Sequence, residues 1–277
     1  MKSPMLMALL SAVVLVSLAM VAPGGWSARW RDAAPDSRDD VRRRLFELLQ
    51  PVTVAGCELE RFGEPHDGGY LMCGNLLGDV EAAYSYGISG YDGWGCDISR
   101  RLGAPVHQYD CYDTRQPACP GGETIFHPVC VAGSSRTRDG RLFEPMQKQI
   151  ADNGHTGRRL AIKMDVEGSE WETLLAYPED LLRDIDQFAI EFHGTDDERF
   201  VRAVEKLKRH FHVAHLHFNN YACVQTAAPF PSWAYEVLFV NKRLAPVVEG
   251  ARPRMPHPLD APNDPGAVEC PPPGHSS

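Results

Sequence analysis

Strand-like and helix-like segments alternate through the middle of the chain, and this alternation constrains the fold most strongly. Seven short apolar runs have the length of strands: 82–88, 106–109, 125–132, 160–166, 185–192, 213–218 and 234–240. Helical patterns lie between several of them, over 94–102, 142–151 and 169–176 and again after Thr195. Strands that alternate with helices favour an α/β fold, here a mostly parallel seven-stranded sheet with helices on both faces. The last two runs predict an antiparallel edge hairpin, and Pro128 moves the third run toward a sheet edge.

The two ends of the chain differ from this middle part. Residues 5–22 carry no charge and follow Lys2, so 1–22 is predicted to be a secretory signal peptide or a type II membrane anchor. The lack of a clear cleavage site favours the anchor. A polar linker is expected over 23–40, and the proline-rich segment 246–277 is expected to be an irregular or disordered tail, because proline fixes φ and removes an N–H donor. The domain between them is predicted over 41–245, opening with an amphipathic helix over 40–50.

Cysteine usage and net charge narrow the cellular setting. The chain has 8 cysteines and no CxxC motif, which favours disulfides in an oxidising compartment over a zinc or thioredoxin-like site. Pairing is left open, although Cys57 with Cys73 and Cys111 with Cys119 are close enough in sequence to close single loops. The expected location is the secretory pathway, either anchored in a Golgi-like lumen or secreted, with membrane contact only through the N-terminal segment. A formal charge of −9 argues against a nucleic-acid partner.

Three groups of residues follow predicted strands, where an open parallel sheet binds its ligands. The first is the glycine-rich loop 87–93, whose glycines permit tight turning and close backbone approach to a ligand. It lacks the GxGxxG spacing, so a dinucleotide is not specifically indicated. The second is Asp110, which stands about twenty residues further on and could accept the hydroxyl protons of a ribose. A plain glycine turn and a helix cap are the structural alternatives for these two features.

The third group is the acidic run over 162–174, and it has two explanations. The helix macrodipole and a capping box opened by Ser169 account for Glu170 and Glu172 at the start of the predicted helix. Asp165 and Glu167 precede that helix, so they are expected to face the crevice beyond the strand ends.

Histidine adds a further candidate at the end of the fifth strand. Glu191 and His193 share one face of that strand, and a histidine near a carboxylate can act as a general base at neutral pH. With Asp165 they could also collect a divalent cation, where oxygen-rich ligands favour magnesium or manganese over zinc, but no metal is assigned. Simple packing is the alternative for His193, and packing is the favoured interpretation of His215.

Several of these segments resemble a known family. The run IKMDVEGSEWETLL at 162–175 resembles the signature of FkbM-type methyltransferases, and YSYGISGYDGWGCDISRRLGAPVHQYDCYD at 84–113 resembles the first two strands of the same class. The wider arrangement resembles the methyltransferase-like proteins of the secretory pathway numbered group twenty-four, through RFGEPHDGGYLMC upstream and AIEFH, HFNN and AYEVLFV downstream. The resemblance covers roughly 57–240.

This resemblance implies a class I, Rossmann-like fold that binds S-adenosylmethionine. Carried over residue by residue, Gly87, Ser89 and Gly90 would line the methionine part of the cofactor. Asp110 would hold the ribose, and Asp165 would sit near the methionine amino group and the transferred methyl. Ser89 departs from the family pattern, because glycine often holds that position, and its side chain would narrow the pocket.

The resulting hypothesis is a methyltransferase that acts on a hydroxyl of a small molecule or a glycan, with a sugar among the candidates. The cofactor carries the difficult step, so the protein needs to align the acceptor oxygen and remove its proton. Glu167 or His193 is the predicted base, beside Asp165. Two alternatives stay open: a metal-assisted methyltransferase, and a luminal binding module whose pocket has lost catalysis. A nicotinamide dehydrogenase is disfavoured by the glycine spacing.

Overall fold

The computed structural model describes residues 37–271. The predicted signal peptide or anchor over 1–22, and the linker up to residue 36, lie outside the described residues. Helix α1 (Arg38–Leu48) begins two residues earlier than predicted, because Ser37 caps it: its hydroxyl accepts a hydrogen bond from Asp40 N at 3.2 Å. Across 37–271, no helix combines the length and the apolar character needed to cross a membrane.

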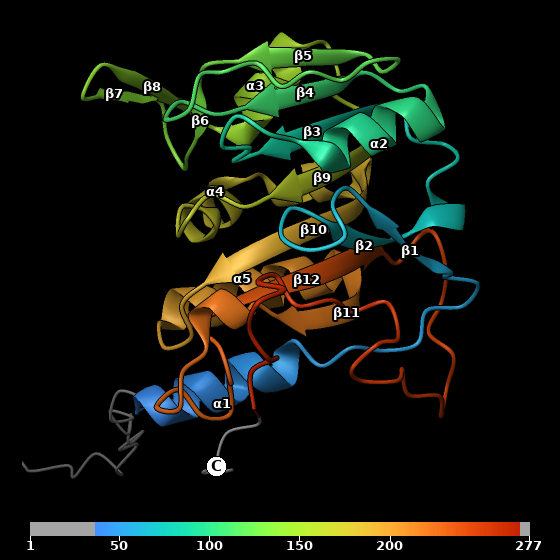
Figure 1. Ribbon diagram of the computed structural model, residues 1–277, viewed down its shortest axis with the longest axis vertical. Coiled ribbons are helices and arrows are strands. Elements are labelled where there is room, and N and C mark those ends of the chain that lie inside the picture. The colour runs from blue at the N-terminus through green and yellow to red at the C-terminus, as the bar shows by residue number, and fades with distance from the viewer. Residues whose placement is uncertain (1–36, 272–277) are drawn as a thin grey trace, which may run out of the picture. The chain divides into compact units, whose positions relative to one another are not determined.

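Seven strands form a mixed central sheet, in the order β11-β12-β10-β9-β3-β4-β5 (Figure 1). Their bounds are β3 (Ala82–Tyr86), β4 (Val106–Tyr109), β5 (Thr124–His127), β9 (Leu160–Met164), β10 (Ile185–His193), β11 (Phe211–Phe218) and β12 (Ala234–Asn241). Strands β3, β4, β5, β9 and β10 pair in parallel with one another. Strand β12 runs antiparallel to both β10 and β11. The predicted seven-stranded α/β sheet is confirmed as a mixed sheet, with five parallel strands and the expected antiparallel pairing of the last two strands. Numbered along the chain, the parallel strands lie in the order 3-2-1-4-5, which is consistent with a Rossmann-like fold.

Helices pack on both faces of this sheet, as predicted (Figure 1). One face carries α1, α3 (Met146–Asp152), α4 (Glu170–Ala176) and α5 (Glu198–His210); the other carries α2 (Gly93–Leu102) and the hairpin of β1 (Leu59–Phe62) with β2 (Tyr70–Cys73). Short 3₁₀ segments are η1 (Gly74–Leu76), η2 (Glu179–Asp184) and η3 (Asn220–Ala222). Strand alternation divides the core in two: Tyr84 and Tyr86 of β3 pack on the first face, and Ala83 packs on the second.

The segment between β4 and β9 differs from its prediction. Pro128 divides the expected strand 125–132 into β5, which is an edge strand as predicted, and β6 (Cys130–Val131). Strand β6 joins β7 (Arg136–Arg138) and β8 (Arg141–Glu144) in a separate three-stranded sheet. The helix expected over 142–151 therefore begins only at α3, because Pro145 disfavours helical geometry at the residue before it. This small sheet lies at the carboxyl-end side of the parallel strands (Figure 1).

All eight cysteines pair, as predicted for an oxidising compartment: Cys57–Cys73, Cys96–Cys119, Cys111–Cys130 and Cys223–Cys270. The suggested pairing of Cys57 with Cys73 is confirmed, but that of Cys111 with Cys119 is wrong. Strands β4 and β5 are parallel neighbours, so the segments that leave their carboxyl ends bring Cys111 beside Cys130. Four disulfides fit a protein of the secretory-pathway lumen or the cell exterior.

The C-terminal segment from residue 246 forms no helix or regular strand in its described part, as its proline content predicts. It is nevertheless packed against the sheet. Asp260 Oδ1 lies 2.7 Å from His215 Nε2 on β11, and Asn263 Nδ2 donates to Glu236 Oε1 on β12 at 2.8 Å. The disulfide of Cys270 fastens its end. His215 is therefore a packed, paired histidine, as its favoured interpretation stated.

Candidate functional site

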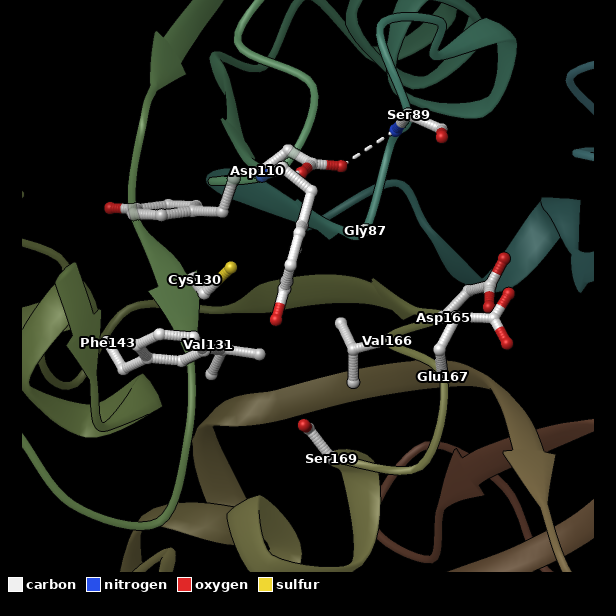
Figure 2. Close-up of a pocket in the computed structure, with 12 residues that line it drawn as sticks. Gly87, Ser89, Asp110, Cys130, Val131, Phe143, Asp165, Val166, Glu167 and Ser169 are labelled. Carbon is white, nitrogen blue, oxygen red and sulfur yellow. Dashed lines mark hydrogen bonds between the residues drawn. The ribbon is translucent and has the colours of Figure 1, made fainter. Parts of the chain in front are cut away.

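A pocket of about 310 Å³ opens at the carboxyl ends of β3, β4 and β9 (Figure 2). The chain order reverses at β3, which has β4 on one side and β9 on the other, so the pocket occupies the switch point where such sheets bind ligands. Its volume lies at the lower end of the range for small-molecule sites. The lining residues are Gly87, Ser89, Tyr109, Asp110, Tyr112, Cys130, Val131, Phe143, Asp165, Val166, Glu167 and Ser169.

Most of the predicted site residues meet in this pocket. The structure brings together the five that come from three separate strand ends: Gly87, Ser89, Asp110, Asp165 and Glu167. Gly90 and His193 are not among the lining residues. A Cβ on Gly90 would lie 2.7 Å from Asp113 Oδ2, so this glycine packs against the loop after β4.

The pocket has an apolar end and an acidic end. Figure 2 shows Cys130, Val131 and Phe143 together at one end, and the carboxylates of Asp165 and Glu167 side by side at the other. The apolar wall comes from β6 and β8 of the small sheet, and the acidic wall comes from the turn between β9 and α4. A ligand that is flat and apolar at one end and positively charged at the other would match both walls.

The loop after β3 is shaped by close backbone contacts. Gly87 has φ 73°, and a Cβ there would lie 1.6 Å from the carbonyl oxygen of Asp165, so only glycine lets the ends of β3 and β9 approach this closely. Lys163 Nζ donates to the Gly87 carbonyl oxygen at 2.7 Å from beneath the loop. Ser89 adopts the left-handed region with φ 47°, which glycine would occupy at lower cost.

Asp92 ties this loop to both neighbouring elements. Its Oδ1 accepts hydrogen bonds from Gly95 N at 2.8 Å and from Ser85 Oγ at 3.0 Å, and its Oδ2 accepts one from Gln108 Nε2 at 2.8 Å. Burial raises the pKa of Asp92 despite these donors. The contacts join β3, α2 and β4, and so they hold the pocket's loop in place.

Asp110 organises two loops with one carboxylate. Its Oδ2 accepts hydrogen bonds from Ile88 N at 3.1 Å and Ser89 N at 2.8 Å, and its Oδ1 accepts from Tyr112 N at 2.8 Å and Asp113 N at 3.1 Å. An ionised carboxylate offers about four lone-pair positions, so the loops already engage this group fully. A ribose hydroxyl would share these oxygens with backbone N–H groups, and the ribose role stays a prediction.

Asp165 stands at the acidic end, directly after β9. Its Oδ2 accepts a hydrogen bond from Tyr70 Oη at 3.3 Å and lies 3.7 Å from Lys163 Nζ. Burial, with the charge of Asp165 as the next cause, raises the pKa of Tyr70 well above its ordinary value, so this hydroxyl stays a donor. Tyr70 also reaches Glu191 Oε2 at 3.5 Å. The hairpin β1–β2 thus closes the acidic end from one side.

Glu170 lies in the first turn of α4, as the macrodipole interpretation expects, and it also holds His193. The Glu170 side chain is fully buried, and it accepts hydrogen bonds from Gly168 N at 2.8 Å and His193 N at 2.7 Å. Its Oε1 also lies 3.0 Å from His193 Nδ1. The predicted capping box is wrong, because Ser169 makes no side-chain hydrogen bond at the start of α4. The carboxylate of Glu170 is directed to the end of β10 instead.

His193 lies directly beside the pocket, next to its acidic wall. Its Nε2 is 3.4 Å from Glu167 Oε2 and 3.8 Å from Glu191 Oε1. Burial lowers the pKa of His193, but the hydrogen bond and charge of Glu170 outweigh it, so the pKa is raised overall. Burial and then the charge of Asp165 raise the pKa of Glu191. Both shifts are in the direction that favours proton binding, and the charges of Glu170 and Asp165 contribute to them.

The possible cation ligands differ from the predicted set. Asp165, Glu167 and His193 each offer a ligand atom, and these atoms lie within 4.8 Å of one another. Glu191 was predicted in place of Glu167. It lies deeper and is already engaged, because its Oε1 accepts a hydrogen bond from Asn219 Nδ2 at 2.7 Å.

Sequence reasoning missed several residues of this site. Tyr70 and Lys163 lie within the motifs quoted for the family resemblance, so a closer examination of those motifs could have found them. Val131 and Phe143 had no such signal, because their segment was expected to form one strand and one helix. Their position depends on the small sheet, which no local pattern indicated.

Comparison with known proteins does not extend these observations. No protein-family model matches the chain, and no curated protein matches its sequence. The resemblance to FkbM-type methyltransferases therefore rests on the quoted motifs, and function has to be argued from the geometry of the pocket.

Proposed function

We propose that this protein is an S-adenosylmethionine-dependent methyltransferase that acts on a hydroxyl group of a small molecule or a glycan. The observation that carries the proposal is the single pocket that joins the loop at Gly87, the carboxylate of Asp110 and the acidic turn at Asp165. These three groups come from different strand ends and meet at the switch point of the sheet.

The two ends of the pocket fit the chemistry of that cofactor. Val131 and Phe143 offer an apolar wall for a flat base, and Asp165 with Glu167 offers negative charge for an ammonium and a sulfonium. Asp110 lies between them, near the place where a ribose would connect the two parts (Figure 2). The residues that line the pocket therefore suit S-adenosylmethionine, the cofactor that the resemblance implies.

When bound, the cofactor supplies a methyl group on a positively charged sulfur, which is reactive without further activation. The chain has to orient the acceptor hydroxyl and take its proton. Glu167 is our candidate for this base, and two observations support it: its side chain is 81% exposed, and its Oε2 lies 3.4 Å from His193 Nε2. A proton accepted by Glu167 can pass to His193, which Glu170 holds in a fixed orientation.

Calorimetric titration of the whole protein with S-adenosylmethionine tests the proposal, followed by transfer of a labelled methyl group to a panel of glycans and small hydroxyl compounds. We expect binding, with an affinity at least tenfold weaker in Asp165→Asn. Asp152→Asn is the matched control, because Asp152 is exposed and is not among the lining residues, and it should bind normally. Failure of the folded protein to bind would overturn the proposal. Binding without transfer to any acceptor would overturn the enzymatic part and favour the luminal binding module.

A further inference from the structure

We propose that Asp165, Glu167 and His193 form a binding site for a divalent transition-metal cation of the Mn²⁺ type. The site lies at the acidic end of the pocket and draws its ligands from the β9–α4 turn and the end of β10. The inference goes beyond the proposed function, and it uses two of the carboxylates that the proposed function assigns to the cofactor, Asp165 and Glu167, so it is tested without any cofactor present.

The spacing of the ligand atoms matches a bound cation. One atom from each residue lies within 4.8 Å of the other two. Adjacent ligands of an octahedral cation held at about 2.1 Å lie about 3.0 Å apart. Glu167 Oε2 is already 3.4 Å from His193 Nε2, and the widest spacing in the cluster has to shorten by at most about 1.8 Å. Glu167 can supply this shift, since its side chain is 81% exposed and its carboxylate is free to turn.

The orientation of His193 is a second and independent observation. Its Nδ1 lies 3.0 Å from Glu170 Oε1, and an ionised carboxylate only accepts, so the ring carries its hydrogen at Nδ1. In the neutral ring, Nε2 then presents a lone pair toward Glu167 and Glu191. Within residues 37–271, no hydrogen-bond donor reaches this nitrogen, although the side chain is only 9% exposed. Metal-binding histidines are held in this way, with the other ring nitrogen donating to a carboxylate.

The charges around Nε2 also point to a cation. The carboxylates of Asp165 and Glu167 lie side by side in the pocket (Figure 2), and the ammonium of Lys163 lies 3.7 Å from Asp165 Oδ2. That ammonium already donates to the carbonyl oxygens of Tyr86 and Gly87. A divalent cation would balance both carboxylates and occupy the lone pair of His193.

The ligand types select among cations. Two carboxylates and one imidazole form a mixed oxygen and nitrogen set, which suits Mn²⁺ better than Ca²⁺ or Mg²⁺, whose protein ligands are oxygens. The structural zinc sites that close with four protein ligands have more ligands than this cluster offers. The exposed side of Glu167 leaves the remaining coordination positions open to water.

Titration of the chelator-treated, full-length protein with MnCl₂, in the absence of any cofactor, tests the site. Electron paramagnetic resonance counts free Mn²⁺, and tryptophan fluorescence gives a second readout, because the Trp233 ring lies 5.7 Å from the His193 ring. We expect one Mn²⁺ per chain, weaker binding of Mg²⁺, and at least a tenfold loss of Mn²⁺ affinity in Glu167→Gln. His193→Gln should lose affinity likewise, but Glu167→Gln is the primary variant because an exposed side chain can be changed without unfolding the protein.

The matched control is Glu205→Gln, which removes the same charge from an exposed position on α5 and should leave Mn²⁺ affinity unchanged. Absence of Mn²⁺ binding, or binding that Glu167→Gln does not weaken, would overturn the site. Because no cofactor is present, this result is separate from the test of methyl transfer. A protein that binds Mn²⁺ but not S-adenosylmethionine would keep the cation site and lose the proposed function.

Discussion

Replacing Asp110 with asparagine keeps the size of the side chain but removes half of its acceptor capacity. In the structure, Oδ2 accepts from Ile88 N and Ser89 N, and Oδ1 accepts from Tyr112 N and Asp113 N. An amide retains one oxygen. Whichever way it turns, its NH₂ group faces two backbone N–H donors, so one of the two loops loses both of its hydrogen bonds.

The cost can be worked from these contacts. A hydrogen bond to a charged group contributes about 1.5–3 kcal/mol, so two lost bonds amount to about 3–6 kcal/mol. The Ser89 and Tyr112 contacts are part-buried, and water can reach the freed N–H groups after a small movement of the loop. We therefore expect Asp110→Asn to lower the free energy of unfolding by about 2–4 kcal/mol. The exposed Asp152→Asn control should stay within about 0.5 kcal/mol.

Urea denaturation with the disulfides intact, followed by tryptophan fluorescence, measures this difference. A loss for Asp110→Asn no larger than that of the control would refute the view that this carboxylate holds the two loops. The same variant also tests the ribose prediction at a temperature where it remains folded. Unchanged affinity for S-adenosylmethionine would make the role of Asp110 purely structural.

Glu170→Gln should lower the free energy of unfolding by about 2–3 kcal/mol, because an amide cannot accept from all three N–H groups that the buried carboxylate holds; urea denaturation indistinguishable from wild type would contradict this. Burial lowers the pKa of His217, but the hydrogen bond that its ring donates to the Glu236 carboxylate outweighs burial and raises the pKa to about 9 from 6.5. Protonated His217 should therefore contribute up to about 3 kcal/mol to the free energy of unfolding, in full below pH 6.5 and with loss as the pH rises through 9. If the free energy of unfolding varies with pH in the same way in wild type and in His217→Gln, this prediction is wrong. The double variant Cys111→Ser with Cys130→Ser removes a disulfide that spans a separation of 19 residues. It should lower the free energy of unfolding by about 3 kcal/mol and weaken cofactor binding, because Cys130 lines the pocket. An unchanged melting temperature would contradict the predicted loss of stability.

Local patterns in the sequence determined the strands and the order in which they follow one another. Apolar runs bounded by polar or glycine-rich turns predicted β4 without error, and they predicted β3, β9 and β10 to within two residues at each end. These signals are local, because the burial of a strand on both faces shows in its own composition. Asp110 and Asp165 could therefore be placed at strand ends, and their meeting in one pocket follows from parallel pairing.

Only the tertiary structure decided what each acidic group contacts. The carboxylate of Glu170 could have been a helix-end charge, and it became the partner of His193 because α4 packs against the end of β10, 23 residues further along the chain. Likewise, Cys111 pairs with Cys130, and Phe143 closes the pocket, because the chain folds back into a small sheet after β5. Such contacts depend on how distant segments dock, and a side chain's own neighbours in sequence carry no record of that docking. The sequence alone thus determined where the chemistry-bearing residues stand along the strands, and the three-dimensional packing decided which of them face one another.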